Sequence, residues 1–474
     1  MVFSSILFIL YFLPVFLIVY HLVGKKYKNY VLLISSIFFY SWGAPKFIFV
    51  ILGTTLIDFQ IVKWMGQTED DSKRKKLLTV SVFVNIGLLF YFKYCNFFIE
   101  NVNALLSGLK VHQLQLLKVV LPIGISFYTF ETITYLVDVY RKLHKPLLNF
   151  KDYLLYILFF PKLIAGPIVR YHDLADQITD RTSNDTIDNR LTGFYRFAIG
   201  LAKKVLIANQ LGEQADTVFA MQVSDLDTFT AWIGILAYTF QIYFDFSGYS
   251  DMAIGIAKMV GFKIPENFDN PYTSRSITEF WRRWHISLGN WMRNYLYIPL
   301  GGNKVDTKAR LFFNLWIVFL LSGFWHGASW GFIIWGAYHG VFLILDRLFL
   351  AKTLGKVGGV VSTLFTFLAV AIGWVFFREE KVGDAFLFIQ RLFRFDSISE
   401  ISFEKEFYIW FIIAVLFSFL ACFKIGKNLQ NGFYFSIYSN KKHFFVALIS
   451  LVLVGLSVSS ITSFGFNPFI YFRF

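Results

Sequence analysis

The sequence predicts an all-α, polytopic membrane helical bundle. Only 16% of its 474 residues are charged and 56% are hydrophobic, whereas a soluble domain carries about 25% charged residues. The apolar residues form long runs without Asp, Glu, Lys or Arg, at 228–244, 311–345, 357–377 and 444–472. A helix crosses the bilayer with about 20 such residues, and the period-2 pattern of a membrane barrel is absent. The composition thereby excludes a soluble enzyme and a disordered chain.

The apolar runs predict about 11–13 spans or re-entrant segments in one membrane domain over 1–474. The first run has no Lys or Arg before it and is followed by Lys25, Lys26 and Lys28. It is therefore expected to be a retained span rather than a signal peptide. In chain order the expected spans are 3–22, 29–45, 47–62, 77–98, 117–140, 150–168, 190–212, 228–247, 310–323, 328–350, 357–377, 405–423 and 443–461.

Basic loops set the expected topology. The loops 63–76, 141–145 and 424–442 are rich in Lys and Arg, and short loops of this kind are cytoplasmic. The net charge of +14 then reflects these loops and their contact with anionic headgroups rather than nucleic acid. An aromatic tail at 464–474 is expected on the extracytoplasmic side.

The segment 262–310 is too polar to span and too aromatic for an ordinary loop. Its basic residues include Arg282, Arg283 and Arg293, with Trp281 among them. One interpretation is an interfacial helix. The other, which is compatible with the first, is a basic and aromatic-lined mouth for an anionic ligand such as a phosphorylated cofactor.

His326 is the residue that most strongly indicates chemistry. It lies in an otherwise apolar span between Gly323 and Gly327, and an ionisable group at membrane depth is a functional hypothesis by default. The alternative is a neutral histidine with a structural hydrogen bond. The glycines thin the helix, so that a ligand or another backbone could approach closely. A neutral imidazole there could act as a general base.

Other candidates are less specific. For His285 a structural and a functional role are about equally favoured, whereas His339 is more typical of structure. Asp245 and Asp251 flank an apolar span, which indicates either proton coupling in a transporter or, as the favoured interpretation, a helix break capped by polar side chains. The sequence contains no zinc-binding His pair, Walker loop or serine nucleophile elbow, and the two cysteines lack metal spacing. No metal is expected.

The last residues, 469–474, are almost all aromatic or basic. They are typical of an aromatic belt with Arg473 reaching the interface. Alternatively, Tyr471 is presented to a site as a nucleophile. Its phenol would need a neighbouring base, which a histidine could supply.

Six stretches together resemble one known family, the membrane-bound O-acyltransferases. Within that family they are most similar to the bacterial branch of alginate O-acetylation and peptidoglycan O-acetyltransferase A. They occur in the family's order over about half of the chain, which makes the resemblance specific. The stretches are 121–127, 165–170, 241–251, 280–288, 295–303 and 322–330.

This resemblance implies a tunnel through the helical bundle, with His326 as the family's invariant histidine and His285 as a supporting polar residue. It implies acetyl-CoA as the cytoplasmic acyl donor, without a metal, in a multi-pass protein of the bacterial inner membrane. The partner would be an extracytoplasmic SGNH-type acetyltransferase, and the final acceptor an extracellular or cell-wall polysaccharide.

A mechanism follows as a hypothesis. Acetyl-CoA docks near Trp281, Arg282, Arg283 and Arg293. His326 then assists acetyl transfer to Tyr471, and the partner moves the acetyl group to a sugar. The alternatives are a D-alanyl or other acyl transferase of the same family, a polysaccharide transporter without covalent chemistry, and a structural scaffold.

Overall fold

The computed structural model describes residues 1–395, 403–464 and 469–470. Within these residues every regular element is a helix and no strand is present, which confirms the all-α fold class. The described residues form two compact units. Unit 1 holds Met1–Arg190 with Ala257–Pro265, and unit 2 holds the described part of Leu191–Ile256 and Glu266–Phe474. The expected single membrane domain over 1–474 stays a prediction.

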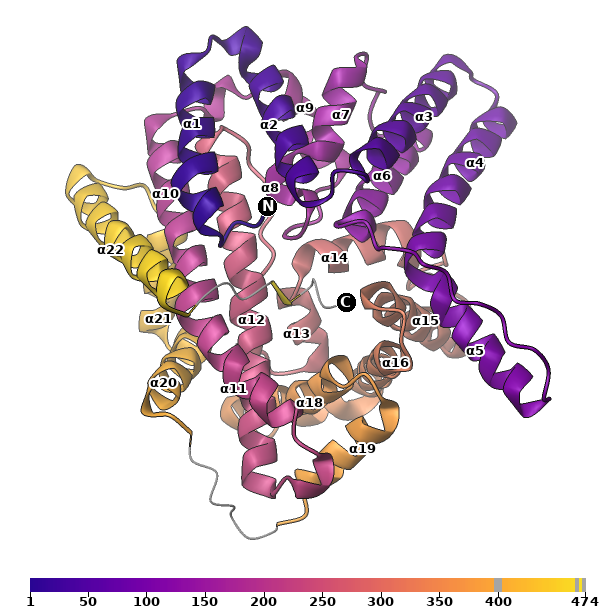
Figure 1. Ribbon diagram of the computed structural model, residues 1–474, viewed down its shortest axis with the longest axis vertical. Helices are drawn as coiled ribbons and strands as arrows, with labels where there is room; N and C mark the ends of the chain where they lie inside the picture. The colour runs from indigo at the N-terminus through magenta and orange to yellow at the C-terminus, as the bar shows by residue number, and fades with distance from the viewer. Residues whose placement is uncertain (396–402, 465–468, 471–474) are drawn as a thin grey trace. The chain divides into compact units, whose positions relative to one another are not determined.

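Unit 1 contains the helices drawn from indigo to purple in Figure 1. Short 3-10 and π-helical turns carry the label η. The elements are η1 (Leu7–Phe12), α1 (Leu13–Leu22), η2 (Lys25–Tyr27), α2 (Lys28–Gly43), α3 (Ile48–Gln67), α4 (Asp71–Leu89), η3 (Phe90–Tyr94), α5 (Cys95–Gly108), α6 (Ile125–Tyr140), α7 (Phe150–Leu158), α8 (Phe160–Leu163), α9 (Tyr171–Thr179) and η4 (Thr182–Asn184).

Unit 2 contains the remaining helices, with most of α10 and α12. The elements are α10 (Ile187–Ala202), η5 (Lys203–Ala208), α11 (Asn209–Phe219), η6 (Val223–Asp225), α12 (Thr228–Met259), η7 (Pro271–Thr273), α13 (Ile277–Arg283), α14 (Ile286–Trp291), η8 (Met292–Tyr297), α15 (Lys308–His326), α16 (Trp330–Leu345), η9 (Asp346–Leu350), α17 (Ala351–Leu354), α18 (Gly359–Arg378), α19 (Val382–Arg391), α20 (Lys405–Phe419), η10 (Leu420–Cys422), α21 (Lys424–Tyr434) and α22 (Asn440–Phe464).

Among the described residues, 7 helices are long and apolar enough to cross a membrane. A further, shorter apolar helix covers Leu7–Leu22. The chain is therefore a multi-pass membrane protein. The seven are Ile48–Gln67, Asp71–Gly108, Lys308–His326, Trp330–Leu354, Gly359–Arg378, Lys405–Cys422 and Asn440–Ser463.

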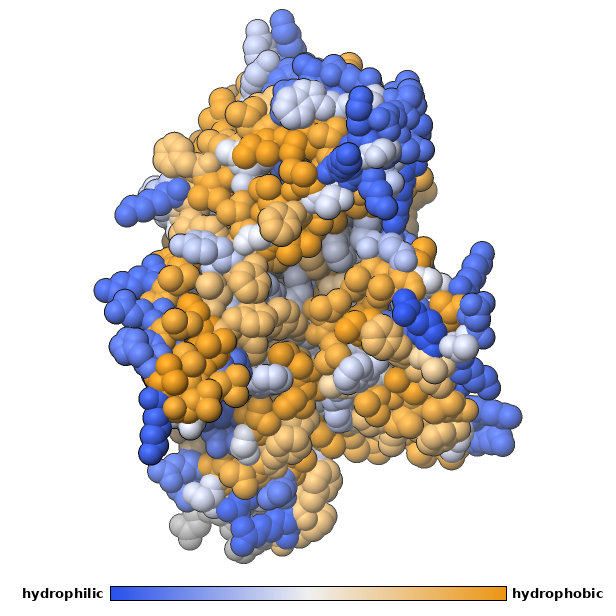
Figure 2. All heavy atoms as spheres, turned by 90° about the vertical axis from the view of Figure 1, so that its right-hand side faces the viewer, coloured by the Kyte–Doolittle hydropathy of each residue, from blue (hydrophilic) through white to orange (hydrophobic). Residues whose placement is uncertain are grey.

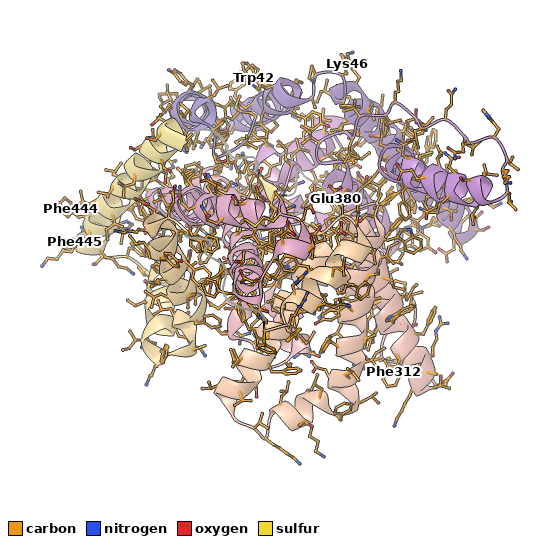
Figure 3. All side chains as sticks on the ribbon, turned by 60° about the horizontal axis from the view of Figure 1, so that its bottom comes forward. Trp42, Lys46, Phe312, Glu380, Phe444 and Phe445 are labelled. Atoms are coloured by element: carbon orange, nitrogen blue, oxygen red, sulfur yellow. The ribbon has the colours of Figure 1, made fainter. Side chains whose placement is uncertain are left out.

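The surface carries the side chains that a lipid environment requires. Wide hydrophobic areas, orange in Figure 2, cover the visible face between hydrophilic margins. On α22, Phe444 and Phe445 point outward (Figure 3), and both are well exposed. Exposed apolar area on this scale exceeds what a soluble monomer presents, so these faces are suited to contact with the lipid hydrocarbon.

The helix in the expected span 117–140 starts later than the apolar run. α6 begins at Ile125, directly after Gly124, whose φ of +78° lies in the left-handed region. A Cβ at this glycine would lie 2.6 Å from the carbonyl oxygen of Leu163. Only glycine fits such a turn, and the turn fixes where α6 starts.

The expected span 150–168 is not one helix. It breaks at Phe159 into α7 and the short α8. Pro161 sits in the first turn of α8, where the missing backbone donor of proline costs nothing, whereas it would disrupt a continuous helix.

The favoured interpretation of Asp245 and Asp251 as marks of a helix break is wrong. α12 continues without interruption through both residues to Met259. Each carboxylate is instead paired with a lysine of η5: Lys204 Nζ lies 3.1 Å from Asp245, and Lys203 Nζ lies 2.7 Å from Asp251. The lysines neutralise both charges, so that an unbroken helix can bury them.

Close packing of α10 against α12 permits these ion pairs. A Cβ at Gly200 would lie 2.5 Å from the carbonyl oxygen of Gly248, and a Cβ at Gly248 would lie 2.7 Å from that of Gly200. Small residues let membrane helices approach at backbone distance, and η5 follows α10 directly.

Two of the predicted cytoplasmic loops, 63–76 and 141–145, lie beside each other in unit 1. Lys142 Nζ contacts a carboxylate oxygen of Glu69 at 3.0 Å. The buried guanidinium of Arg74 donates hydrogen bonds to two carbonyls in the last turn of α6, which is favourable at a helix C-terminus. The contact agrees with the prediction that both loops lie on one side of the membrane.

Candidate functional site

His326 lies in unit 2 at the last residue of α15, and its side chain is 5% exposed. Three aromatic rings surround it in edge-on geometry. The ring centroids of Trp325, Trp335 and Phe377 lie 4.9, 5.2 and 5.2 Å from the imidazole. An aromatic shell of this kind excludes water, so charge that develops within it is weakly screened.

The glycines that flank His326 serve backbone packing. A Cβ at Gly323 would lie 2.2 Å from the carbonyl oxygen of Phe332 in α16, and one at Gly327 would lie 2.1 Å from the Phe332 ring. Of the two alternatives for these glycines, close approach by another helix is therefore the one that the structure supports.

A second histidine, His339, extends the aromatic cluster on α16. Its ring lies 4.9 Å from Trp281 and 5.2 Å from Trp335. Neither of its nitrogens has a hydrogen-bond partner among the described residues, and the same holds for the indole nitrogens of Trp281 and Trp335. Buried polar groups are normally paired. This cluster is therefore unusual, because several of its buried nitrogen atoms have no hydrogen-bond partner among the described residues.

His285 occupies an unusual backbone position between α13 and α14. Its φ of 45° and ψ of 54° lie in the left-handed region, which is sparsely populated by residues other than glycine. The side chain is buried. Strained residues of this kind persist where the surrounding structure fixes them, often at functional sites.

Asn267 fixes the orientation of the His285 ring. Its Oδ1 accepts from the backbone N–H of Ser287 at 3.3 Å and from the Ser287 hydroxyl at 2.8 Å. Its Nδ2 donates to Ser250 Oγ on α12. Oδ1 is thus an acceptor, and His285 Nδ1, at 3.0 Å, must donate to it. The unprotonated nitrogen of the neutral ring is then Nε2.

The Nε2 atom of His285 is buried and has no hydrogen-bond partner among the described residues. Burial lowers the pKa of His285 to about 3, and α13 and α14 are outside the seven candidate spans. The imidazole is consequently neutral at physiological pH. With Nδ1 held by Asn267, Nε2 carries the free lone pair of the ring.

Trp325 lies between the two histidines. Its ring is 6.4 Å from that of His285 and 4.9 Å from that of His326. The structure therefore places both predicted histidines in the same aromatic cluster of unit 2, although they come from different helices.

Phe469 and Ile470, near the C-terminus, also lie in this region. Phe469 and Ile470 are 1% and 2% exposed. The Phe469 ring stacks on Tyr249 of α12 at 4.6 Å and lies 6.0 Å from Phe246. Phe246 in turn contacts His285 at 4.6 Å. These two tail residues are core residues of unit 2. Tyr471 and the remainder of the predicted tail after Ile470 lie outside the described residues.

The four residues predicted to bind the cofactor have different surroundings. Trp281 packs into the aromatic cluster, with its ring 5.3 Å from Phe319. Arg283 pairs with Glu279 at 2.7 Å. Arg282 and Arg293 are exposed. The assignment of these residues to acetyl-CoA stays a prediction.

Two residues that contribute to the site, Asn267 and Trp335, were not identified from the sequence. Asn267 lies 18 positions before His285, which is beyond any local spacing rule. Trp335 is seven residues after the start of its predicted span, 328–350, and nothing in the sequence distinguishes it from the other apolar residues of that span. Among the described residues, no group of three or more His, Cys, Asp or Glu side chains could hold a metal ion.

Comparison with known proteins decides the family. The profile of the membrane-bound O-acyltransferase family matches residues 34–354, which is more than half of the chain. The chain belongs to the membrane-bound O-acyltransferase family. The match includes His285, His326 and His339.

Two bacterial relatives are similar to this acyltransferase over most of its length, and a third is similar over about half of it. A probable alginate O-acetylase of Pseudomonas aeruginosa is 45% identical over 398 residues, which is 84% of this chain and 76% of the relative. A peptidoglycan O-acetyltransferase of Helicobacter pylori is 36% identical over 440 residues, or 86% and 82%. A teichoic acid D-alanyltransferase of Bacillus subtilis is 33% identical over 238 residues, or 48% and 59%.

Family membership and the spanning helices together establish the protein class. The chain is an O-acyltransferase and a multi-pass bacterial membrane protein. The tunnel implied by the resemblance stays a prediction.

Proposed function

We propose that this acyltransferase moves acetyl groups from cytoplasmic acetyl-CoA across the membrane for O-acetylation of an extracytoplasmic polysaccharide. The observation that carries the proposal is the position of His326, buried in an aromatic shell at the end of a spanning helix. The relatives named for acetylation of alginate and peptidoglycan cover more than four fifths of the chain, which supports acetyl as the acyl group and a polysaccharide as the acceptor.

In the proposed reaction His326 acts as the general base. It takes the proton of the Tyr471 phenol as the phenol oxygen attacks the thioester carbonyl. The carbon–sulfur bond breaks, and coenzyme A leaves as a thiol once it has received that proton. The products are acetyl-Tyr471 and free coenzyme A. His285, neutral and oriented by Asn267, supports proton movement beside it.

The acetyl ester then passes to the polysaccharide. An extracytoplasmic SGNH-type acetyltransferase takes the group from the phenyl ester and gives it to a sugar hydroxyl, which regenerates the tyrosine. Trp281, Arg282, Arg283 and Arg293 are proposed to lie near the coenzyme A entrance, where the exposed guanidiniums would meet its phosphates.

Replacement of His326 tests the base. His326→Ala should lower acetyl transfer by about 10²–10⁴-fold, because general-base assistance contributes that much. The assay is transfer of labelled acetyl from acetyl-CoA by purified protein in nanodiscs. His443→Ala, outside the aromatic cluster, is the control. Transfer at the normal rate by a folded His326→Ala protein would exclude the role of His326.

Replacement of Tyr471 tests the carrier. Tyr471→Phe keeps the ring and removes the attacking oxygen, so it should abolish acetylation of the polysaccharide. Mass spectrometry of the wild-type C-terminal peptide should show an acetylated Tyr471. Full polysaccharide acetylation by Tyr471→Phe would leave the tail as an aromatic anchor instead.

The same peptide distinguishes the alternatives. A D-alanyl transferase, which the similarity to the Bacillus subtilis enzyme keeps as the second candidate, would give the mass of alanyl-Tyr471. A transporter without covalent chemistry would give an unmodified peptide. The shorter match to the D-alanyl enzyme, 48% of this chain, favours acetyl.

A further inference from the structure

The pair of Lys204 and Asp245 is a charged group that the proposed reaction does not use. Both side chains are almost fully buried in unit 2. Lys204 Nζ lies 3.1 Å from Asp245 Oδ1 and 3.2 Å from Oδ2. A buried ion pair is costly to place in a membrane protein and is usually retained for a specific task.

Asp245 makes a further contact with the C-terminal segment. The backbone N–H of Ile470 donates a hydrogen bond to Asp245 Oδ2 at 3.0 Å. The two residues are 225 positions apart in the chain. A carboxylate that accepts from a backbone N–H forms one of the stronger types of hydrogen bond.

Aromatic packing holds the same segment on the same helix. Phe469 stacks on Tyr249, one turn beyond Asp245 on α12, at 4.6 Å and an interplanar angle of 29°. One ring, that of Phe246, lies between Phe469 and His285. The hydrogen bond fixes the backbone of the segment and the stacking fixes its side chain.

The geometry points to Asp245, supported by Lys204, as the positioning residue that clamps Phe469 and Ile470 inside unit 2 beside the histidine cluster. Lys204 pairs with the carboxylate and orients it, and Asp245 holds the backbone at Ile470. The residue that follows Ile470 in the sequence is Tyr471. The value of the clamp for acyl transfer rests on the proposed function, whereas the clamp itself does not.

A matched pair of double variants isolates the clamp. Lys204→Met with Asp245→Leu removes the acceptor without leaving a buried charge unpaired. Lys204→Met with Asp245→Asn also removes both charges but keeps an acceptor oxygen for the Ile470 N–H. Both are made in full-length protein that carries Ile470→Cys, with Cys95→Ser and Cys422→Ser.

The measurement is the rate of maleimide labelling of the cysteine at position 470 in nanodiscs. We expect labelling about 10-fold faster or more in the Asp245→Leu variant, because a buried donor loses its partner. The Asp245→Asn variant should stay near the parent rate. Equal labelling of parent and Asp245→Leu protein would overturn the clamp.

Acetyl transfer is measured on the same proteins. Faster labelling together with slower transfer supports both the clamp and the carrier role of the tail. Faster labelling with unchanged transfer keeps the clamp and rejects the carrier role. If the Asp245→Leu protein does not fold, Ile470→Pro removes the donor and leaves the ion pair intact. Ile470→Val is its control, both variants being made without the cysteine at position 470. Equal rates of carboxypeptidase digestion at the C-terminus of these two proteins would overturn the clamp, whereas equal transfer with unequal digestion would reject only the carrier role.

Discussion

At the scale of single residues, the amide of Asn267 decides what His285 can do. The imidazole has two nitrogens, and the hydrogen bond at Nδ1 determines that Nε2 carries the free lone pair. The same amide bonds the backbone N–H and the hydroxyl of Ser287 and the hydroxyl of Ser250. Asn267 therefore orients the ring of His285, whose backbone is in the left-handed region, and connects it to α12.

Asn267→Ala should lower acyl transfer by about 10²-fold, since His285 would lose its fixed tautomer and orientation. Ser287→Ala removes only one donor to the same oxygen and should reduce transfer less. The measurement is acetyl transfer at saturating and limiting donor, with thermal unfolding as a check on folding. Equal activity of Asn267→Ala and wild type would show that the orientation of His285 is not needed.

At the scale of elements, the hairpin of α15 and α16 positions His326. The two helices lie side by side (Figure 1). A Cβ at Gly336 would lie 2.3 Å from the carbonyl oxygen of Phe319. Such contact leaves no room for a methyl group, so the glycine sets the separation of the helices and with it the distance from His326 to Trp335.

Gly336→Ala should destabilise the protein by about 1–3 kcal/mol, the usual cost of overpacking a tight contact. Gly455→Ala in α22, where nothing lies within 4 Å of the added Cβ, should be neutral or slightly stabilising. Thermal unfolding in detergent compares the two. If the Gly336→Ala protein is as stable as the Gly455→Ala protein, α15 and α16 can separate enough for the methyl group without loss of stability.

At the scale of the whole molecule, contacts between charged loops indicate the membrane topology. The ion pair of Lys142 with Glu69 joins two loops, and an ion pair of this length requires both to lie on one side of the bilayer. Surface pairs contribute little stability, so the contact reports topology rather than folding energy.

Cysteines placed singly at Glu69 and Lys142, in protein with Cys95→Ser and Cys422→Ser, should both react with an impermeant maleimide in inverted vesicles. Neither should react in intact cells whose outer face alone is accessible. Reaction of one site from each side would contradict the predicted cytoplasmic position of these loops.

Local signals in the sequence were sufficient for the class of fold and for one catalytic candidate. Hydropathy runs predicted the spans around 310–323, 328–350 and 357–377, because a helix that faces lipid must be apolar over its length. His326 stood out because an ionisable residue is rare in such a run. Family motifs then supplied His285, which composition alone left undecided.

Only the tertiary structure decided which distant residues act together. Asn267 reaches His285 through a left-handed turn, and Asp245 reaches Ile470 across 225 positions, whereas the sequence favoured a helix break at Asp245. Apolar periodicity reports which residues avoid water, but it does not report partners. A buried hydrogen bond or ion pair depends on the direction in which each side chain points, and packing of the helices determines that direction.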